Sequence, residues 1–250
     1  MRLFWADLHI HTALSPCAEN EMTPPAIIKA AKAKGLEIIG ICDHNSAENV
    51  MAVMEAGATE GITVIGGIEV QTLEDVHVLT FFRHVDALTC WQEEIYAALP
   101  GTWNDEARFG EQLILDSRGR ITGKLCILLL ASTSMSINYL GKRVRELEGI
   151  VIPAHIDRPS FSLIRNLGFV PDALRPDCME ISRNVSVEQA RDRFPCVAGF
   201  SLVKSSDAHR LNEISVSVGF WIEAPKWDEI LLALRLSDGR YVKPEETAVR

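Results

Sequence analysis

The sequence predicts a single α/β domain over residues 1–250, a distorted (β/α)7-type barrel. Three observations support this prediction. Short apolar runs alternate with segments of helical spacing along most of the chain, and neither an internal repeat nor a low-complexity linker divides it. Most apolar runs also end in histidine or a carboxylate, which is typical of barrels whose functional residues lie at the carboxyl-terminal ends of the strands.

The alternation of strand and helix is regular at both ends of the chain. After the first apolar run, a helix is expected to begin at Pro24 with Thr23 as its N-cap. Continuous apolar runs such as residues 36–42 indicate strands that are buried on both faces. The expected strands are 1–10, 36–42, 62–67, 76–82, 149–153, 177–181, 198–204 and 216–222, and the expected helices are 26–34, 47–57, 87–99, 159–167, 187–193 and 227–236.

The middle of the chain departs from this regular order. A β-hairpin is expected over residues 112–125, followed by a helix over 135–148 with Ser134 or Thr133 as its N-cap. We interpret residues 101–148 as an insertion within the barrel. Two interpretations of its role stay open, since the segment either folds over the functional site or forms a plain surface excursion.

The composition is that of an ordinary globular chain, with 47% apolar and 24% charged residues. No apolar run approaches the roughly 20 residues of a membrane span, and no secretory signal precedes Asp7. We therefore expect a cytoplasmic protein without a membrane partner. The net charge of -9 argues against an extended nucleic-acid surface. Six cysteines without a Cys-x-x-Cys pair exclude a zinc ribbon and a disulfide framework.

The residues at the strand ends predict a metal centre. His9 and His11 are two apart on one strand, so their side chains point to the same side and can converge on one ion. Histidine and carboxylate ligands without paired cysteines suit zinc, manganese or iron. One tetrahedral ion needs about four ligands, so this larger set indicates two or three divalent ions. The candidate ligands at the strand ends are His9, His11, His44, Glu69, His155, Asp207 and His209, and a further strand carries His77.

Together these motifs resemble the PHP (polymerase and histidinol phosphatase) superfamily of metal-dependent phosphoesterases. The resemblance rests on their order along residues 3–210 and on their strand context. The matching motifs are Asp7-Leu8-His9-Ile10-His11-Thr12 with Ser15, the Asp43-His44 pair, a glutamate after the third strand, two isolated histidines and a terminal Asp-x-His.

The resemblance implies how the ligands are shared among the ions. His9, His11, Glu69 and Asp207 would hold the first ion, and Glu69 would bridge to a second ion held by His77 and His155. His44 and His209 would hold a third ion. Family members often supply a further histidine to that ion, and here Cys17 occupies the position. A thiolate is a good zinc ligand, so we expect Cys17 to complete the third site.

Two neighbouring cations about 3.5–4 Å apart would activate a bridging hydroxide for in-line attack on phosphorus. Arg158 and Arg183 are the candidates for binding the phosphate oxygens, and Arg210 also follows a strand at the rim. Asp7 and Asp43 adjoin ligand histidines, so they would either orient the imidazoles or protonate the leaving group. Glu180 would orient a ligand in a similar way or form a structural salt bridge.

The resemblance therefore implies a hydrolase of a small phosphate monoester or a short nucleotide phosphodiester. Two alternatives stay open. An amidohydrolase-type barrel also opens with His-x-His, but it would normally place a lysine between the metal ions, and only Lys124 and Lys142 lie between His77 and His155. The other alternative is a metal-binding accessory protein without catalytic activity. The oligomeric state stays open.

Overall fold

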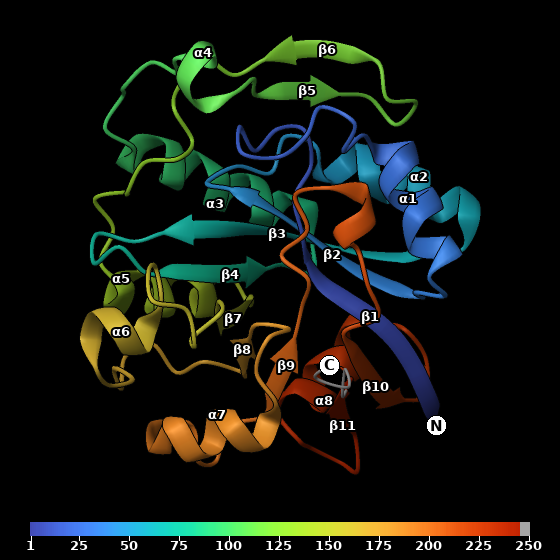
Figure 1. Ribbon diagram of the computed structural model, residues 1–250, viewed down its shortest axis with the longest axis vertical. Helices are drawn as coiled ribbons and strands as arrows, with labels where there is room; N and C mark the ends of the chain where they lie inside the picture. Colours follow the sequence, from blue (N-terminus) through green and yellow to red (C-terminus); the bar gives the residue numbers. More distant parts are fainter. Residues whose placement is uncertain (246–250) are drawn as a thin grey trace.

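A computed structural model describes residues 1–245, and the last five residues of the expected domain lie outside this part. A curled sheet has the strand order β11-β10-β1-β2-β3-β4-β7 (Figure 1). Its strands are β1 (Arg2–Ile10), β2 (Ile38–His44), β3 (Thr63–Gln71), β4 (His77–Phe81), β7 (Ile150–Pro153), β10 (Val218–Ile222) and β11 (Tyr241–Pro244). The strand β11 had not been predicted, because its burial alternates and its apolar character is weak.

A parallel pair of strands closes this sheet into a barrel. The pair consists of β8 (Met179–Ile181) and β9 (Leu202–Lys204). On one side, the Asp177 N–H donates to the Val151 carbonyl in β7 at 2.9 Å. On the other side, the Ala208 N–H donates to the His9 carbonyl, and the His11 N–H donates to the Ala208 carbonyl. Strands β1, β2, β3, β4, β7, β8 and β9 thus surround one interior, which confirms the distorted (β/α)7-type barrel.

The strands do not all run in one direction, and this corrects the expected geometry. Strands β1, β2 and β3 are parallel, but β4 is antiparallel to both β3 and β7. His77 is consequently the first residue of its strand, where it pairs with Gln71 near the end of β3. The reversed direction brings His77 to the same rim as the carboxyl-terminal ends of the parallel strands.

Helices cover the outer face of the barrel (Figure 1). Alternate strand residues face opposite sides of the sheet. In β7, Val151 packs in the apolar cluster that includes most of the helices, whereas Ile150 and Ile152 pack in a second, separate apolar cluster. Strands β1 and β2 approach closely at Gly40, where an added Cβ would lie 2.3 Å from the Leu8 carbonyl oxygen. The helices that flank the strands are α1 (Pro24–Ala33), α2 (Val50–Glu60), α3 (Val85–Ala98), α5 (Ile137–Glu146), α6 (Leu163–Leu167), α7 (Val187–Arg193) and α8 (Trp227–Leu234).

The expected hairpin forms from β5 (Leu113–Leu115) and β6 (Ile121–Lys124), preceded by the short helix α4 (Glu106–Phe109), at the top of the view in Figure 1. The Leu113 N–H donates to the Ala13 carbonyl, so the hairpin supports the loop that follows β1. That residues 101–148 are an insertion stays a prediction.

The N-cap of α5 is Ser136, and neither of the two hydroxyl residues expected at this position caps the helix. The Thr133 hydroxyl donates to the Gln71 carbonyl and the Ser134 hydroxyl to the Ala98 carbonyl, so both are engaged elsewhere. None of the helices in residues 1–245 is long and apolar enough to cross a membrane.

Candidate metal centre

Four predicted ligands converge at the barrel rim. His9 and His11 come from the end of β1, Glu69 from β3 and Asp207 from the segment after β9. Their potential ligand atoms all lie within 4.8 Å of one another. The two histidine Nε2 atoms are 3.1 Å apart, and the Nε2 atom of His11 lies 3.0 Å from Oδ1 of Asp207. Buried side chains thus direct nitrogen and oxygen atoms at one point.

The hydrogen-bond network indicates the tautomers of the two histidines. Nδ1 of His9 lies 3.2 Å from the Glu180 carboxylate, so it donates. The Ser15 hydroxyl donates to Asp43 at 2.6 Å and therefore accepts from Nδ1 of His11 at 2.9 Å. Both Nε2 atoms are then lone-pair acceptors facing carboxylates. Since buried acceptors without a donor are costly, this donor set fits a cation.

The electrostatic field at His9 leads to the same conclusion. Burial by itself lowers the pKa of this histidine, but the charges of Glu180, Asp207 and Glu69 raise the pKa well above its usual value. Negative charge therefore surrounds the imidazole, with Glu69 and Asp207 facing Nε2 at 3.4 and 3.3 Å, where a bound cation would balance it.

Two further groups of possible ligands share residues with the first. Glu69 lies 2.9 Å from Nδ1 of His77 and 2.9 Å from Nδ1 of His44, and these three residues form one group. His11, His44 and His209 form the other. His155 lies 3.3 Å from Glu69 through Nε2, outside the compact groups of the described chain. The structure therefore places His44 beside Glu69 and His77 as well as beside His209.

Orphaned polar atoms also mark this cluster. His77 Nε2 and His155 Nδ1 are buried and have no hydrogen-bond partner among the described residues. Both rings thus retain a nitrogen that is available for another interaction. Buried nitrogens without a partner, on rings that also contact Glu69, are consistent with a cation-binding cluster.

Cys17 lies next to the third group but outside it. Its sulfur is not part of any compact ligand group in residues 1–245. Cys17 is an exposed residue whose thiol lies against two histidines. Desolvation of the thiol raises its pKa, but the charge of His44 and hydrogen bonds with His209 and His44 outweigh this and lower the pKa to about 6. A thiolate therefore forms readily beside these histidines. The metal-ligand role of Cys17 stays a prediction.

The placement of Asp7 corrects one of its two expected roles. The carboxylate is buried and accepts hydrogen bonds from the backbone N–H groups of Ser206 and Ser215 at 2.9 and 3.2 Å. Within residues 1–245 it makes no hydrogen bond to an imidazole ring, because the strand directs it toward these backbone groups. Asp7 thus fixes the segment that leads to Asp207, and its role in protonating a leaving group stays a prediction.

Asp43 reaches a ligand histidine through a hydroxyl, and its catalytic role stays a prediction. It accepts hydrogen bonds from the N–H and the hydroxyl of Thr12, both at 2.7 Å, and from Ser15. Ser15 in turn orients His11. Sequence reasoning gave Ser15 no role, although its position four residues after His11 was a usable signal.

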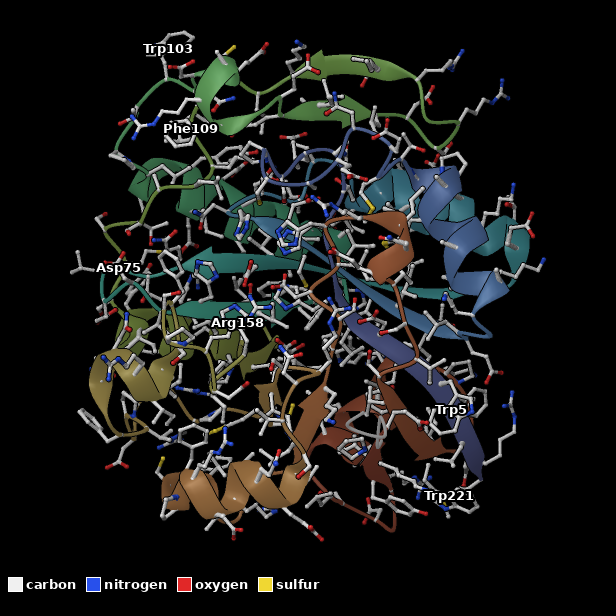
Figure 2. All side chains as sticks on the ribbon, viewed as in Figure 1. Trp5, Asp75, Trp103, Phe109, Arg158 and Trp221 are labelled. Atoms are coloured by element: carbon white, nitrogen blue, oxygen red, sulfur yellow. The ribbon has the colours of Figure 1, made fainter. Side chains whose placement is uncertain are left out.

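The predicted arginines surround two cavities beside the ligands. Arg158 lines both and forms an ion pair with Asp207 at 2.6 Å, and it lies near the middle of the view in Figure 2. One cavity has a volume of about 130 Å³ and borders His44, Glu69, His77 and His155. The other has a volume of about 390 Å³ and is lined in part by Arg183 and Arg210.

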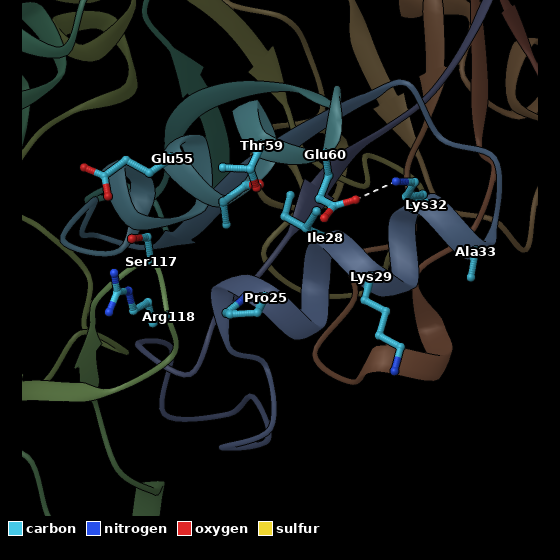
Figure 3. A pocket seen from close by; sticks show the side chains of 11 residues that line it. Pro25, Ile28, Lys29, Lys32, Ala33, Glu55, Thr59, Glu60, Ser117 and Arg118 are labelled. Carbon is cyan, nitrogen blue, oxygen red and sulfur yellow. Dashed lines mark hydrogen bonds and ion pairs between the residues drawn. The ribbon is translucent and has the colours of Figure 1, made fainter.

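A larger cavity of about 720 Å³ lies elsewhere, between α1, α2 and the turn of the hairpin (Figure 3). Its polar side chains include Lys29, Glu55, Arg118 and an ion pair between Lys32 and Glu60. No histidine lines this cavity in the described chain. We therefore assign the chemistry to the smaller cavities, where the possible ligands converge.

Left-handed backbone conformations are frequent in this region. His155 and Asp207 have φ angles of 30° and 52°, and Phe161, which lines the 130 Å³ cavity, has a φ angle of 55°. Such conformations are costly for residues other than glycine, and they are often found at functional sites. Here they direct two possible ligands and one aromatic ring toward the same rim.

Comparison with known proteins supports the family resemblance. A family model described as PHP domain matches residues 7–147. The uncharacterized protein YqxK of Bacillus subtilis is 23% identical over 97% of this chain and 64% of its own length. The lesion-specific endonuclease PfuEndoQ of Pyrococcus furiosus has the same fold, with a TM-score of 0.73 and 20% identity over 96% of this chain and 57% of its own. The chain thus spans less than two thirds of either protein.

A second structure corrects the prediction about partners. Endonuclease Q in complex with a 27-mer duplex that carries an abasic lesion at the active site matches 96% of this chain and 58% of its own, with a TM-score of 0.69 and 19% identity. The expectation of a small substrate and no extended nucleic-acid surface, which was drawn from the net charge, is therefore wrong. Net charge sums over the whole molecule, whereas a nucleic acid contacts one face.

Proposed function

Because this chain belongs to the PHP domain family, we propose that it is a metal-dependent phosphoesterase. The observation that supports this proposal most directly is the convergence of four buried acceptors, from His9, His11, Glu69 and Asp207, on one point. Two lone-pair nitrogens and two carboxylates in such contact are consistent with a divalent ion such as zinc, manganese or iron.

The neighbouring groups would hold one or two further ions. Glu69 would bridge the first ion to a second, with His77 and with His44 or His155 as the other ligands. His209 and Cys17 would contribute to a third. When bound, such cations lower the pKa of a water molecule and neutralise negative charge on phosphate oxygens.

The residues around the ions would position the substrate. Arg158 extends along the cavity from its ion pair with Asp207, and its guanidinium can donate to phosphate oxygens as well. Arg183 forms no ion pair within residues 1–245, so its guanidinium is available for the second phosphate contact. Glu180 holds His9, and Ser15 holds His11, which keeps both Nε2 atoms directed at the cation.

We propose a phosphodiester of a nucleic acid as the substrate class. Fold similarity to endonuclease Q favours this class, and so do the arginines Arg158, Arg183 and Arg210 along the 390 Å³ cavity. Several guanidinium groups around one cavity suit the phosphates of a strand, although Arg158 and Arg210 also form ion pairs with Asp207 and Glu19. Cleavage at a lesion is a property of endonuclease Q and is not part of this proposal.

The proposal is tested by incubating the protein with short DNA strands and with bis(p-nitrophenyl) phosphate, with manganese or zinc or with a chelator. We expect hydrolysis that requires the metal and is lost in His9→Ala, while Lys124→Ala stays active because this residue lies on the exposed hairpin. Bound metal without turnover of either diester would indicate an accessory protein. Hydrolysis of cyclic amides without phosphodiester cleavage would indicate an amidohydrolase.

A further inference from the structure

Phe161 is an aromatic residue at the rim whose position none of the metal chemistry explains. Its ring stacks on the ring of His77, with a centroid distance of 4.7 Å and an interplanar angle of 17°. The residue is 40% exposed, although its neighbour Ser162 is fully buried. One face of the phenyl ring thus covers a possible ligand, and much of the rest is open to solvent.

The backbone holds this ring in place at an energetic cost. Phe161 has a φ angle of 55°, which bulky side chains rarely adopt. Its carbonyl accepts the N–H of His77 at 2.9 Å, and the Ser162 side chain caps α6 immediately afterwards. The residue is thus fixed from both sides. Backbone strain that is maintained in this way beside a cavity is typical of functional sites.

The lining of the cavity limits what can lie inside it. Phe161, Arg158 and Ser160 form part of the wall of the 130 Å³ cavity, and the rest of the wall consists of candidate metal ligands. Such a lining suits the charged oxygens of a phosphate and not the face of a nucleobase. A base that belongs to the bound phosphate would therefore lie at the mouth of the cavity, beside Phe161.

We propose that the open face of Phe161 is the stacking surface for the nucleobase next to the scissile phosphate, which rests on the proposed phosphodiesterase function. The 390 Å³ cavity on the other side of Arg158 has no phenylalanine, tyrosine or tryptophan among its described lining residues. Among the described residues that line the two cavities, Phe161 is therefore the one phenylalanine, tyrosine or tryptophan. Every base has a π face, so stacking gives affinity with little dependence on sequence.

The test compares strands with and without a base. Binding of a fluorescent five-nucleotide thymidine strand and of its abasic counterpart is measured by anisotropy in a chelator, for the unmodified protein and for Phe161→Leu and Phe161→Trp. We expect the unmodified protein to bind the base-containing strand about tenfold more tightly. Phe161→Leu loses this difference because it keeps apolar cover on His77 but cannot stack, and Phe161→Trp keeps it. Phe169→Leu, which alters an exposed phenylalanine away from both cavities, leaves it unchanged.

An equal preference in Phe161→Leu and the unmodified protein overturns the proposal. So does a Phe161→Leu variant that loses only metal affinity, because the ring would then serve only to cover His77. The binding measurement needs no turnover, so it decides the role of Phe161 even if the protein hydrolyses no diester. Absence of hydrolysis refutes the proposed function separately.

Discussion

Substitution of Ser15 by alanine tests whether the hydroxyl network orients the first metal site. The Ser15 hydroxyl donates to Asp43 and accepts from Nδ1 of His11, at 2.6 and 2.9 Å. Ser15→Ala leaves the His11 N–H buried without an acceptor and frees the ring to rotate. Loss of such an outer hydrogen-bond partner typically weakens metal binding 10- to 100-fold, about 1.4–2.7 kcal/mol.

Thr12→Val is the matched control for this substitution. The Thr12 hydroxyl also donates to Asp43 at 2.7 Å, and it accepts from Asn49, but it does not contact an imidazole within the described chain. Both variants lose a buried hydrogen bond to the same carboxylate. We therefore expect each to lower the free energy of unfolding of the metal-free protein by about 1–3 kcal/mol, while only Ser15→Ala loses metal affinity.

Urea unfolding in a chelator measures the loss of stability, and competition with a fluorescent zinc chelator measures metal affinity. The reasoning is refuted if Ser15→Ala binds zinc as tightly as the unmodified protein. It is also refuted if Thr12→Val weakens zinc binding to the same extent, because the effect would then come from Asp43 or from general loosening of the loop.

Three other outcomes are expected. Removal of the metal lowers the thermal midpoint, and a cation at 100 times its Kd restores about 2.7 kcal/mol, which calorimetry with and without chelator measures; an unchanged midpoint contradicts a resident cation. Gly40→Ala places a Cβ 2.3 Å from the Leu8 carbonyl oxygen, so we expect it to lower the free energy of unfolding in urea by about 3 kcal/mol or more. In Gly123→Ala the added Cβ lies 3.5 Å from its nearest neighbour, so its free energy of unfolding stays within about 0.5 kcal/mol of the unmodified protein. Arg183→Ala lowers kcat/KM on a DNA strand about tenfold or more through loss of a charged phosphate contact. Arg118→Ala, which alters the distant cavity, leaves kcat/KM unchanged. Equal kcat/KM values for Arg183→Ala and the unmodified protein would exclude the Arg183 contact.

Most of the barrel was predictable because its strands are buried on both faces and are therefore continuously apolar. The direction of a strand leaves no such signal. The expected geometry assumed parallel strands, whereas His77 stands at the start of its strand and reaches the rim because β4 is reversed.

Long-range hydrogen bonds explain what the sequence could not indicate. Ser15 and Asp43 are 28 residues apart, and no local spacing relates them. The N-cap of α5 was misplaced for the same reason, since the Thr133 hydroxyl is bonded to the distant Gln71 carbonyl. Polar side chains select partners in three dimensions, whereas apolar periodicity is a property of one element. Candidate ligands follow from strand ends, and Glu180 was expected to orient one of them, whereas the contact of Ser15 with Asp43 had no signal in the sequence.

The closure of the barrel and the assembly of the site depend on the same few residues. Ala208 joins its backbone to both His9 and His11, and the left-handed Asp207 beside it directs a carboxylate at their Nε2 atoms. At this seam between β9 and β1, the Nε2 atoms of His9 and His11 lie 3.3 and 3.0 Å from the Asp207 carboxylate. A cation held by these three side chains would join the two strands, so metal binding and closure of the seam would favour each other. The strain at Asp207 is thus placed where the binding energy of the metal can offset it.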